Sequence, residues 1–299
     1  MSTPGATPAS LLRRDFAVRA APAYASNPSV VAVVLGGSAA KGHADRFSDL
    51  ELFAVWARPP TDAERRSAIE IAGGDIVRLY EAEEDETGVV WSDAWKIGRC
   101  GDVPFTGVEV DMHHFLAEDV ERTLADVVDT SDPNLAKQNV VGGLLDAVPL
   151  YGDAIVEAWQ ARASTYPDEL RIAVLRAHAP IEGLWQLDAF AVRGNPIGGH
   201  ALLTHLHEQI LHTLLALNRR YYTGFRSLTA VATPLRIAPP DLVRRIQRAY
   251  PLVFGATNQA VANLVEETYD LIEEHVPELP VDRWRRFLRY ERPLWGDRR

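Results

Sequence analysis

Hydrophobic and polar residues follow a strand-like period in the first half of the chain. Residues 30–35 form a continuous apolar, β-branched run that ends at a pair of glycines, which is typical of a strand buried on both faces. Residues 50–56 alternate between apolar and polar positions, and this period-two pattern predicts a second strand. Three further segments with strand-like composition are predicted as strands: 76–80, 89–91 and 108–115.

Helical periodicity begins before the first strand and dominates the second half. Residues 10–24 have the pattern of a short amphipathic helix that ends at the Asn27-Pro28 turn signal. Thr61 opens another helix-like stretch that ends near Gly73. Beyond Phe115, helices are predicted over residues 117–128, 134–146, 154–163, 167–192, 199–222, 240–250 and 258–275. One of them carries an apolar face with spacings of three and four, made of Leu203, Leu206, Ile210, Leu214 and Leu217.

These patterns predict a two-domain protein of α/β and all-α parts. We expect residues 1–152 to form an α/β domain, with a short mixed sheet, flanking helices and an N-terminal helix. We expect residues 153–299 to form an all-helical domain that closes over the substrate. A length of 299 residues, 47% of them hydrophobic and 24% charged, suits a globular protein with one large or two ordinary domains.

Charge and cysteine usage narrow the expected surroundings and partners. The net charge of −10 argues against broad nucleic-acid binding, which needs Lys and Arg at the phosphates. It is compatible with a small substrate, especially a cationic one. No run of 18 apolar residues predicts a membrane span, and the N-terminus lacks a signal-peptide layout. Cys100 is the single cysteine, so a reducing cytoplasm is the simplest expected location.

The candidate chemistry begins at the glycine pair that ends the first predicted strand. There the chain reads Gly36-Gly37-Ser38 and continues into what looks like a helix. Such a turn presents backbone N–H groups, and a helix N-terminus adds a favourable dipole for a phosphate. Glycines also let a ligand approach the backbone closely. We therefore predict a phosphate-binding turn.

Carboxylates follow on the next predicted strands. Asp49 and Glu51 are separated by one residue, so both side chains lie on one face of the strand. Two hard oxygen ligands beside a phosphate turn are what a Mg²⁺-nucleotide site needs. On the 108–115 strand, Asp111 could complete the metal site or take a proton from an attacking hydroxyl, although Glu109 could hold this role instead.

Together these residues resemble the signature of the DNA polymerase β-like nucleotidyltransferase superfamily, in particular bacterial antibiotic nucleotidyltransferases of the aminoglycoside and lincosamide types. The likeness covers roughly residues 27–115 and rests on Gly-Gly-Ser, Lys41-Gly42 and Ser48-Asp49-Leu50-Glu51-Leu52. One departure is Glu51, where family members more often have Asp. A looser likeness, from Leu214 to Tyr222, is to a segment of helical C-terminal domains that close over nucleotide and acceptor.

The resemblance implies roles for eight residues. The triphosphate would be held by Gly36, Gly37 and Ser38, with Lys41 and Ser48 as additional phosphate contacts. The catalytic Mg²⁺ ligands would be Asp49, Glu51 and Asp111.

It also implies a reaction. A nucleoside monophosphate, by default AMP from ATP, would pass to a hydroxyl of a small molecule such as an aminoglycoside-like antibiotic, and pyrophosphate would be released. Two alternatives stay open: a protein or tRNA acceptor, as in toxin-type relatives, and a non-catalytic nucleotide-binding protein. The acceptor, the nucleobase preference and the oligomeric state are left open by the sequence.

Several histidines have a competing metal-site interpretation. His113 and His114 are adjacent, so on a strand they point to opposite faces and cannot both join one site. We therefore interpret them as packed or surface residues. His205, Glu208 and His212 share one side of a predicted helix, and without a further ligand we interpret them as a polar face.

Overall fold

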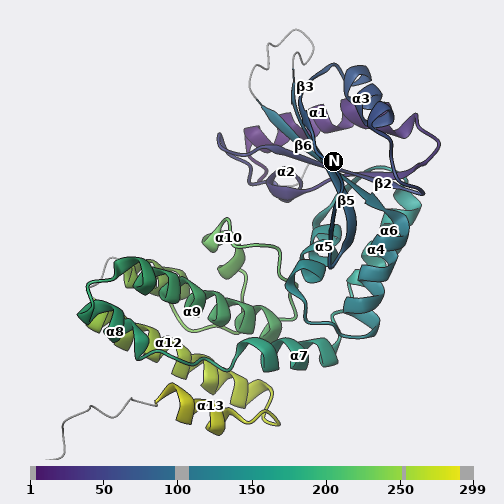
Figure 1. The fold of residues 1–299 in the computed structure, drawn as a ribbon. Coiled ribbons are helices and arrows are strands. Elements are labelled where there is room, and N and C mark those ends of the chain that lie inside the picture. The colour runs from purple at the N-terminus through teal and green to yellow at the C-terminus, as the bar shows by residue number, and fades with distance from the viewer. Residues whose placement is uncertain (1–4, 98–107, 251–253, 290–299) are drawn as a thin grey trace, which may run out of the picture. The chain divides into compact units, whose positions relative to one another are not determined.

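The computed structural model describes residues 5–97, 108–250 and 254–289 (Figure 1). Cys100 lies outside these described residues. The chain divides into two compact units, Met1–Thr165 and Tyr166–Arg299, which we call the sheet unit and the helical unit. The sequence placed this boundary after Gly152. The structure places it later, because helix α6 (Asp153–Ala163) packs against α5, β1 and β7 of the sheet unit.

The sheet unit is built on a mixed sheet, as the sequence predicted. Among the described residues, its seven strands are β1 (Val30–Leu35), β2 (Leu50–Trp56), β3 (Gly74–Leu79), β4 (Glu83–Asp85), β5 (Gly88–Ile97), β6 (Glu109–Leu116) and β7 (Val148–Tyr151). Their order is β3-β5-β6-β2-β1-β7, with β4 paired to β5. The central pair β2 and β6 is parallel, whereas the other pairs are antiparallel. The parallel pair therefore places the two candidate carboxylate strands side by side.

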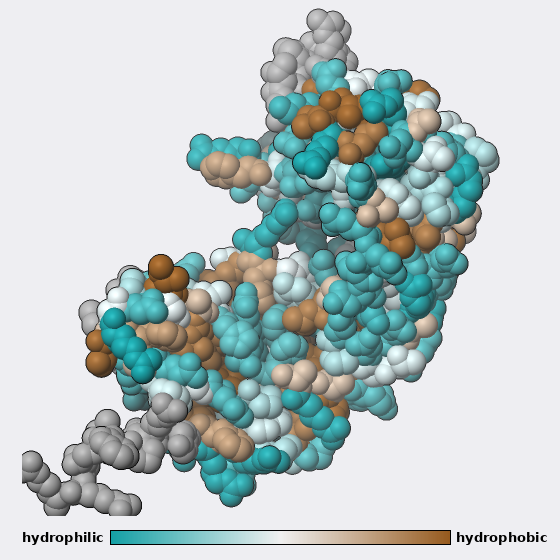
Figure 2. Space-filling view, in the orientation of Figure 1, coloured by the Kyte–Doolittle hydropathy of each residue, from teal (hydrophilic) through white to brown (hydrophobic). Residues whose placement is uncertain are grey.

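Helices pack on this sheet and form several of the connections between its strands. They are α1 (Pro8–Ala25), α2 (Gly37–Lys41), α3 (Asp62–Ile71), α4 (Ala117–Leu124), a π-helix (Ala125–Asp129), α5 (Leu135–Asp146) and α6. The main core joins Phe16 and Tyr24 of α1 to Leu52, Trp56 and Met112 of the two central strands. Hydrophilic side chains cover much of the visible surface of α4 and α6 in Figure 2. The residues of β2 and β6 that alternate with this core, such as Glu51 and Asp111, lie on the opposite face of the sheet.

The helical unit contains α7 (Asp168–His178), α8 (Gln186–Val192), α9 (Pro196–Leu217), α10 (Leu228–Ala232), α11 (Leu242–Ala249), α12 (Phe254–His275) and α13 (Val281–Leu288). Helix α9 packs against α7, α8 and α12. The predicted apolar face is confirmed, because all five of its residues are buried: Leu203, Leu206, Ile210, Leu214 and Leu217. None of the described helices is long and apolar enough to cross a membrane.

Two helix predictions in this unit were wrong in extent. The pattern over residues 167–192 is two helices, α7 and α8, because Pro180 and the left-handed Gly183 (φ 79°) break it. Helix α9 ends at Leu217 and not at 222. Asn218 stops it by donating its side-chain amide to the carbonyls of Leu214 and Ile237 (2.7 and 2.8 Å).

Candidate active site

The glycine turn lies directly against the candidate metal strand. Gly36 donates its backbone N–H to the carbonyl of Glu51 (3.0 Å), which fixes the turn to β2. Gly37 has a φ of 60° in the left-handed region, where L side chains are strained. A Cβ built on Gly37 would lie only 1.8 Å from Oε2 of Glu51. The backbone geometry and the close approach of the carboxylate therefore both require glycine here.

Glu51 and Asp111 face each other across the two central strands. They are Cα partners in the parallel register of β2 and β6, and adjacent strands lie about 4.8 Å apart. Residues on either side alternate as expected, because Leu50, Leu52 and Val110 are fully buried on the core face. The structure therefore brings these two predicted carboxylates onto one face.

Asp49 stands at the entrance to β2 and reaches the same region. It precedes the strand and is half-buried. Burial, followed by the charge of His114, lowers the pKa of His113, while the negative charge of Asp49 acts in the opposite direction. Asp49 is thus close enough to act electrostatically on a side chain that lies two positions beyond Asp111 on the same face.

The three carboxylates share this region without forming a closed metal cage. Across residues 5–97, 108–250 and 254–289, no three His, Cys, Asp or Glu side chains are gathered so that they could hold a metal ion. Like charges repel one another until a cation neutralises them. The donor chemistry fits Mg²⁺, which prefers carboxylate oxygens, and Glu51 and Asp111 are partners in the parallel register of β2 and β6.

Two arginines of α1 hold the backbone on both sides of this site through hydrogen bonds, and the sequence did not predict this role. Arg13 is buried and donates hydrogen bonds to the backbone carbonyls of Ser48 and Asp49. The distance to the Asp49 carbonyl is 3.0 Å. Arg14 donates to the carbonyls of Ala39 and Ala40 at the end of α2 (2.8 and 2.5 Å). No local motif signals this role, because each arginine contacts backbone groups at least 25 residues away.

The other predicted phosphate contacts have defined surroundings. Nζ of Lys41 lies 3.1 Å from the carboxylate of Asp146 at the end of α5. Oγ of Ser48 accepts the N–H of Asp45 (3.0 Å) and donates to its carboxylate (3.2 Å), so it stabilises the turn before β2. Gly36 is buried, and Ser38 is half-buried at the start of α2. The amide groups of a first helical turn have no partner within the helix, so those of α2 suit an anion.

The two adjacent histidines point to opposite faces of β6, as predicted. His113 stacks on Phe53 (ring centroids 5.4 Å apart) and its Nδ1 lies 3.0 Å from Oγ of Ser92 on the candidate-site face. His114 is fully buried on the core face. A zinc site that uses both is therefore excluded by their geometry.

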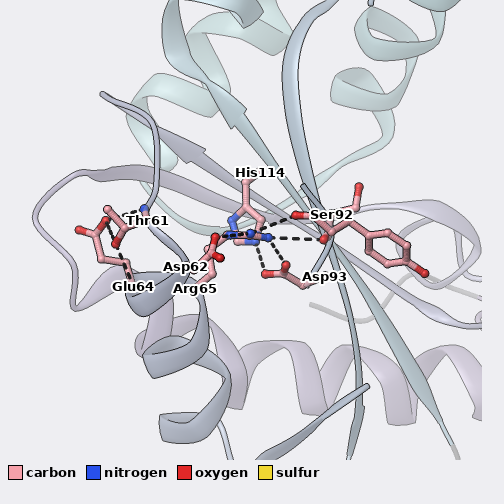
Figure 3. A network of polar contacts seen from close by, with 8 residues as sticks. Thr61, Asp62, Glu64, Arg65, Ser92, Asp93 and His114 are labelled. Atoms are coloured by element: carbon pink, nitrogen blue, oxygen red, sulfur yellow. Dashed lines mark hydrogen bonds and ion pairs between the residues drawn. The ribbon is translucent and has the colours of Figure 1, made fainter. Parts of the chain in front are cut away.

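His114 belongs to a buried polar network that holds β6 in place (Figure 3). The indole N–H of Trp56 donates to Nδ1 of His114 (3.0 Å), so Nε2 carries the proton and donates to Asp93 (2.8 Å). Asp93 also pairs with the buried guanidinium of Arg65 from α3. Arg65 further donates to the carbonyl of Tyr80 (3.0 Å). The network ties α3, β5, β6 and β2 together behind the carboxylate face.

A cavity of about 450 Å³ opens in the sheet unit beside this face. It is bounded by Phe115 and Ser92, and Phe115 lies two positions beyond His113 on the same side of β6. The rim is acidic, and helix α5 supplies Asn139. The carboxylates at the cavity are Glu81, Glu83, Glu84 and Asp85. The volume is that of a pocket for a small molecule.

This chain has little similarity to known proteins. No family model and no curated protein matches the chain. Among solved structures, it resembles a nucleotidyltransferase-like protein from Exiguobacterium sibiricum 255-15, with a TM-score of 0.40 and 11% identity over 88% of this chain and 78% of that one. A likeness at this level carries no argument about activity.

Proposed function

We propose that this chain is a Mg²⁺-dependent nucleotidyltransferase that moves a nucleoside monophosphate, by default AMP from ATP, onto a hydroxyl of a small molecule. One observation carries the proposal: the carboxylate of Glu51 lies against Gly37 of the glycine turn and opposite Asp111 on the parallel neighbour strand. The glycine turn and two carboxylates therefore lie side by side. That combination suits a nucleotide bound with a divalent cation.

Each residue has a defined part in the proposed reaction. The first amides of α2 would bind the triphosphate, and Asp49, Glu51 and Asp111 would hold Mg²⁺. The bound ion supplies charge neutralisation at the phosphoryl oxygens. The acceptor oxygen forms a bond to the α-phosphorus as the bond to the bridging oxygen breaks, and pyrophosphate leaves. Asp111 takes the proton of the acceptor hydroxyl.

The cavity beside Phe115 is the proposed acceptor pocket. It lies on the carboxylate side of β5 and β6, and its volume of about 450 Å³ suits a small molecule better than a folded macromolecule. The carboxylates at its rim favour a cationic acceptor, such as an amine-bearing antibiotic or metabolite. The chain's net charge of −10 supports a small cationic acceptor over tRNA.

The test is pyrophosphate release with each of the four triphosphates against a library of hydroxylated amines. Asp49→Asn, Glu51→Gln and Asp111→Asn should each lower turnover by at least about a thousandfold, because several kcal/mol of metal-dependent stabilisation is removed. Glu109→Gln, which changes an exposed carboxylate on the same face of β6, should retain turnover. Retained turnover in Asp49→Asn would refute the proposal.

Labelled ATP with a cell lysate distinguishes the alternatives. Label on small products supports the proposal, whereas label on protein or RNA indicates a macromolecular acceptor. Mg²⁺-dependent ATP binding without any pyrophosphate release indicates a nucleotide-binding protein without transferase activity.

A further inference from the structure

The loop between the glycine turn and Asp49 presents a cation and an aromatic ring to solvent. Phe47 is 81% exposed, and the guanidinium carbon of Arg46 lies 4.4 Å from the centre of its ring. Among the described residues, the Arg46 side chain contacts this ring, and no carboxylate forms an ion pair with Arg46. The Arg46 side chain is therefore available to a ligand.

The backbone under this pair is held in one conformation. Ser48 donates its N–H to the carbonyl of Asp45 (3.3 Å), so Arg46 and Phe47 are the two central residues of a β-turn. The carboxylate of Asp45 accepts the N–H of Phe47 (2.8 Å), as aspartate does at the first position of such turns. Arg13 then fixes the carbonyl of Ser48 at the end of the turn. The exposed pair is thus presented by an ordered turn.

This turn lies within reach of the proposed triphosphate. His43 donates its N–H to the carbonyl of Ser38 (3.0 Å), which brings the loop back against the start of α2. Arg46 is three residues from His43 and three from Asp49, so its Cα lies within about 11 Å of each. The long arginine side chain can therefore reach phosphates bound at the glycine turn.

The other basic side chains near the turn already have acceptors. Arg13 and Arg14 donate to backbone carbonyls, and Lys41 lies 3.1 Å from Asp146. A triphosphate beside three carboxylates needs positive charge, and a planar guanidinium binds phosphate oxygens in pairs. Arg46 is the cation that best meets this need.

Resting on the proposed function, we propose that Arg46, oriented by the ring of Phe47, binds the β- and γ-phosphates of the nucleoside triphosphate. Lys41, which the resemblance implied as an additional phosphate contact, then acts mainly by joining α2 to α5 through Asp146. Phe47 is a positioning residue in this proposal, because its ring lies against the guanidinium of Arg46 and restricts the conformations of that side chain.

Calorimetric titration with MgATP and with AMP tests this assignment. Arg46→Ala should weaken MgATP binding by about tenfold or more, as expected for a lost charge-assisted contact, and should change AMP binding by less than about twofold. Arg46→Lys should recover part of the loss, and Phe47→Leu should weaken MgATP binding by about threefold. Inorganic tripolyphosphate should displace MgATP from the wild type more effectively than from Arg46→Ala.

A matched control is Arg283→Ala in the helical unit, which removes another exposed arginine that lies over a phenylalanine (5.9 Å). It should bind MgATP as the wild type does. MgATP binding by Arg46→Ala within twofold of the wild type, or equal losses for MgATP and AMP, would overturn the assignment. If the wild type binds no nucleotide, this assignment and the proposed function both fail. If the arginine effect appears but no acceptor yields pyrophosphate, only the transferase proposal fails.

Discussion

The buried histidines of the sheet unit and of the helical unit differ in the hydrogen-bond partners of their ring nitrogens. In the sheet unit, both ring nitrogens of His114 have partners, Trp56 and Asp93. In the helical unit, His207 is 2% exposed and neither ring nitrogen has a hydrogen-bond partner in the described structure. His212 is 8% exposed and its Nε2 also lacks one. The buried histidine behind the candidate site is thus fully hydrogen-bonded, whereas the buried histidines of α9 keep ring nitrogens without partners, which costs stability.

This difference changes how each histidine responds to acid. Burial lowers the pKa of His114 below its usual value, and the hydrogen bond to Asp93 opposes this shift without cancelling it. Burial alone lowers the pKa of His207 to about 4. Burial, with help from His178 and His205, lowers the pKa of His212 to about 3. Each of these buried histidines has a lowered pKa, so each makes the fold sensitive to acid, and only at His114 does a charged partner oppose the effect of burial.

Asp93→Ala should have the largest effect on stability. It leaves Arg65, which is 1% exposed, without its buried partner and removes the acceptor of His114. Breaking a buried ion pair costs about 3–5 kcal/mol. Hydrogen exchange followed by mass spectrometry should show lost protection in β6 and unchanged protection in α9. Asp62→Ala, which removes an exposed partner of Arg65, should cost under about 1 kcal/mol, and equal losses for the two variants would contradict the network's importance.

The second largest loss of stability is expected when the pH is lowered, through His207 and His212 of the helical unit. Above pH 6.5 both states hold His207 and His212 neutral, so pH has no effect through them. Below pH 6.5 the unfolded chain binds protons that the folded chain refuses. Stability then falls by about 1.4 kcal/mol per pH unit for each histidine. The fall through His207 ends near pH 4, where the folded histidine also charges. Thermal unfolding from pH 7 to 5 measures this slope. A double His207→Leu, His212→Leu variant should reduce it and leave the part due to His113, His114 and His178, whose pKa values are also lowered.

Gly37→Ala should disturb the sheet unit locally and abolish transfer. A residue other than glycine at φ 60° costs about 1–3 kcal/mol, and the new Cβ would displace the carboxylate of Glu51. The matched control is Gly73→Ala, since Gly73 has φ 74° and nothing within 4 Å of an added Cβ. Both variants should lose similar backbone stability, but only Gly37→Ala should lose pyrophosphate release. Full activity in Gly37→Ala would break the link between the turn and Glu51.

His207→Leu should have the smallest effect, and with the opposite sign. Leucine removes two unpartnered nitrogens from the packed interior of α9, and an unsatisfied buried polar group costs about 1–3 kcal/mol. We expect a gain of about 1 kcal/mol after allowing for the loss of ring packing on Tyr250 (5.4 Å). Chemical denaturation at pH 7 measures it. A loss of stability would mean that His207 has an unseen partner.

The local sequence determined most of the fold. Alternation and apolar runs placed the strands that contain Glu51 and Asp111, because side-chain direction in a strand depends only on its period of two. Helical spacing identified the buried face of α9 for the same kind of reason. The short strands β4 and β7 and the short helices α10 and α13 were not predicted, because brief segments depend on their neighbours more than on their own pattern.

Tertiary structure decided which residues meet. The pairing of Glu51 with Asp111 required a parallel register between strands about 60 residues apart, which no local pattern specifies. The same holds for Arg13 and Arg14 beneath the site, for Asp146 beside Lys41, and for the Asp93 network behind β6. Sequence fixes local direction through backbone geometry. Which residues become hydrogen-bond or ion-pair partners over long sequence distances depends on how whole helices and strands pack. A polar side chain can pair with any complementary group that the fold brings next to it.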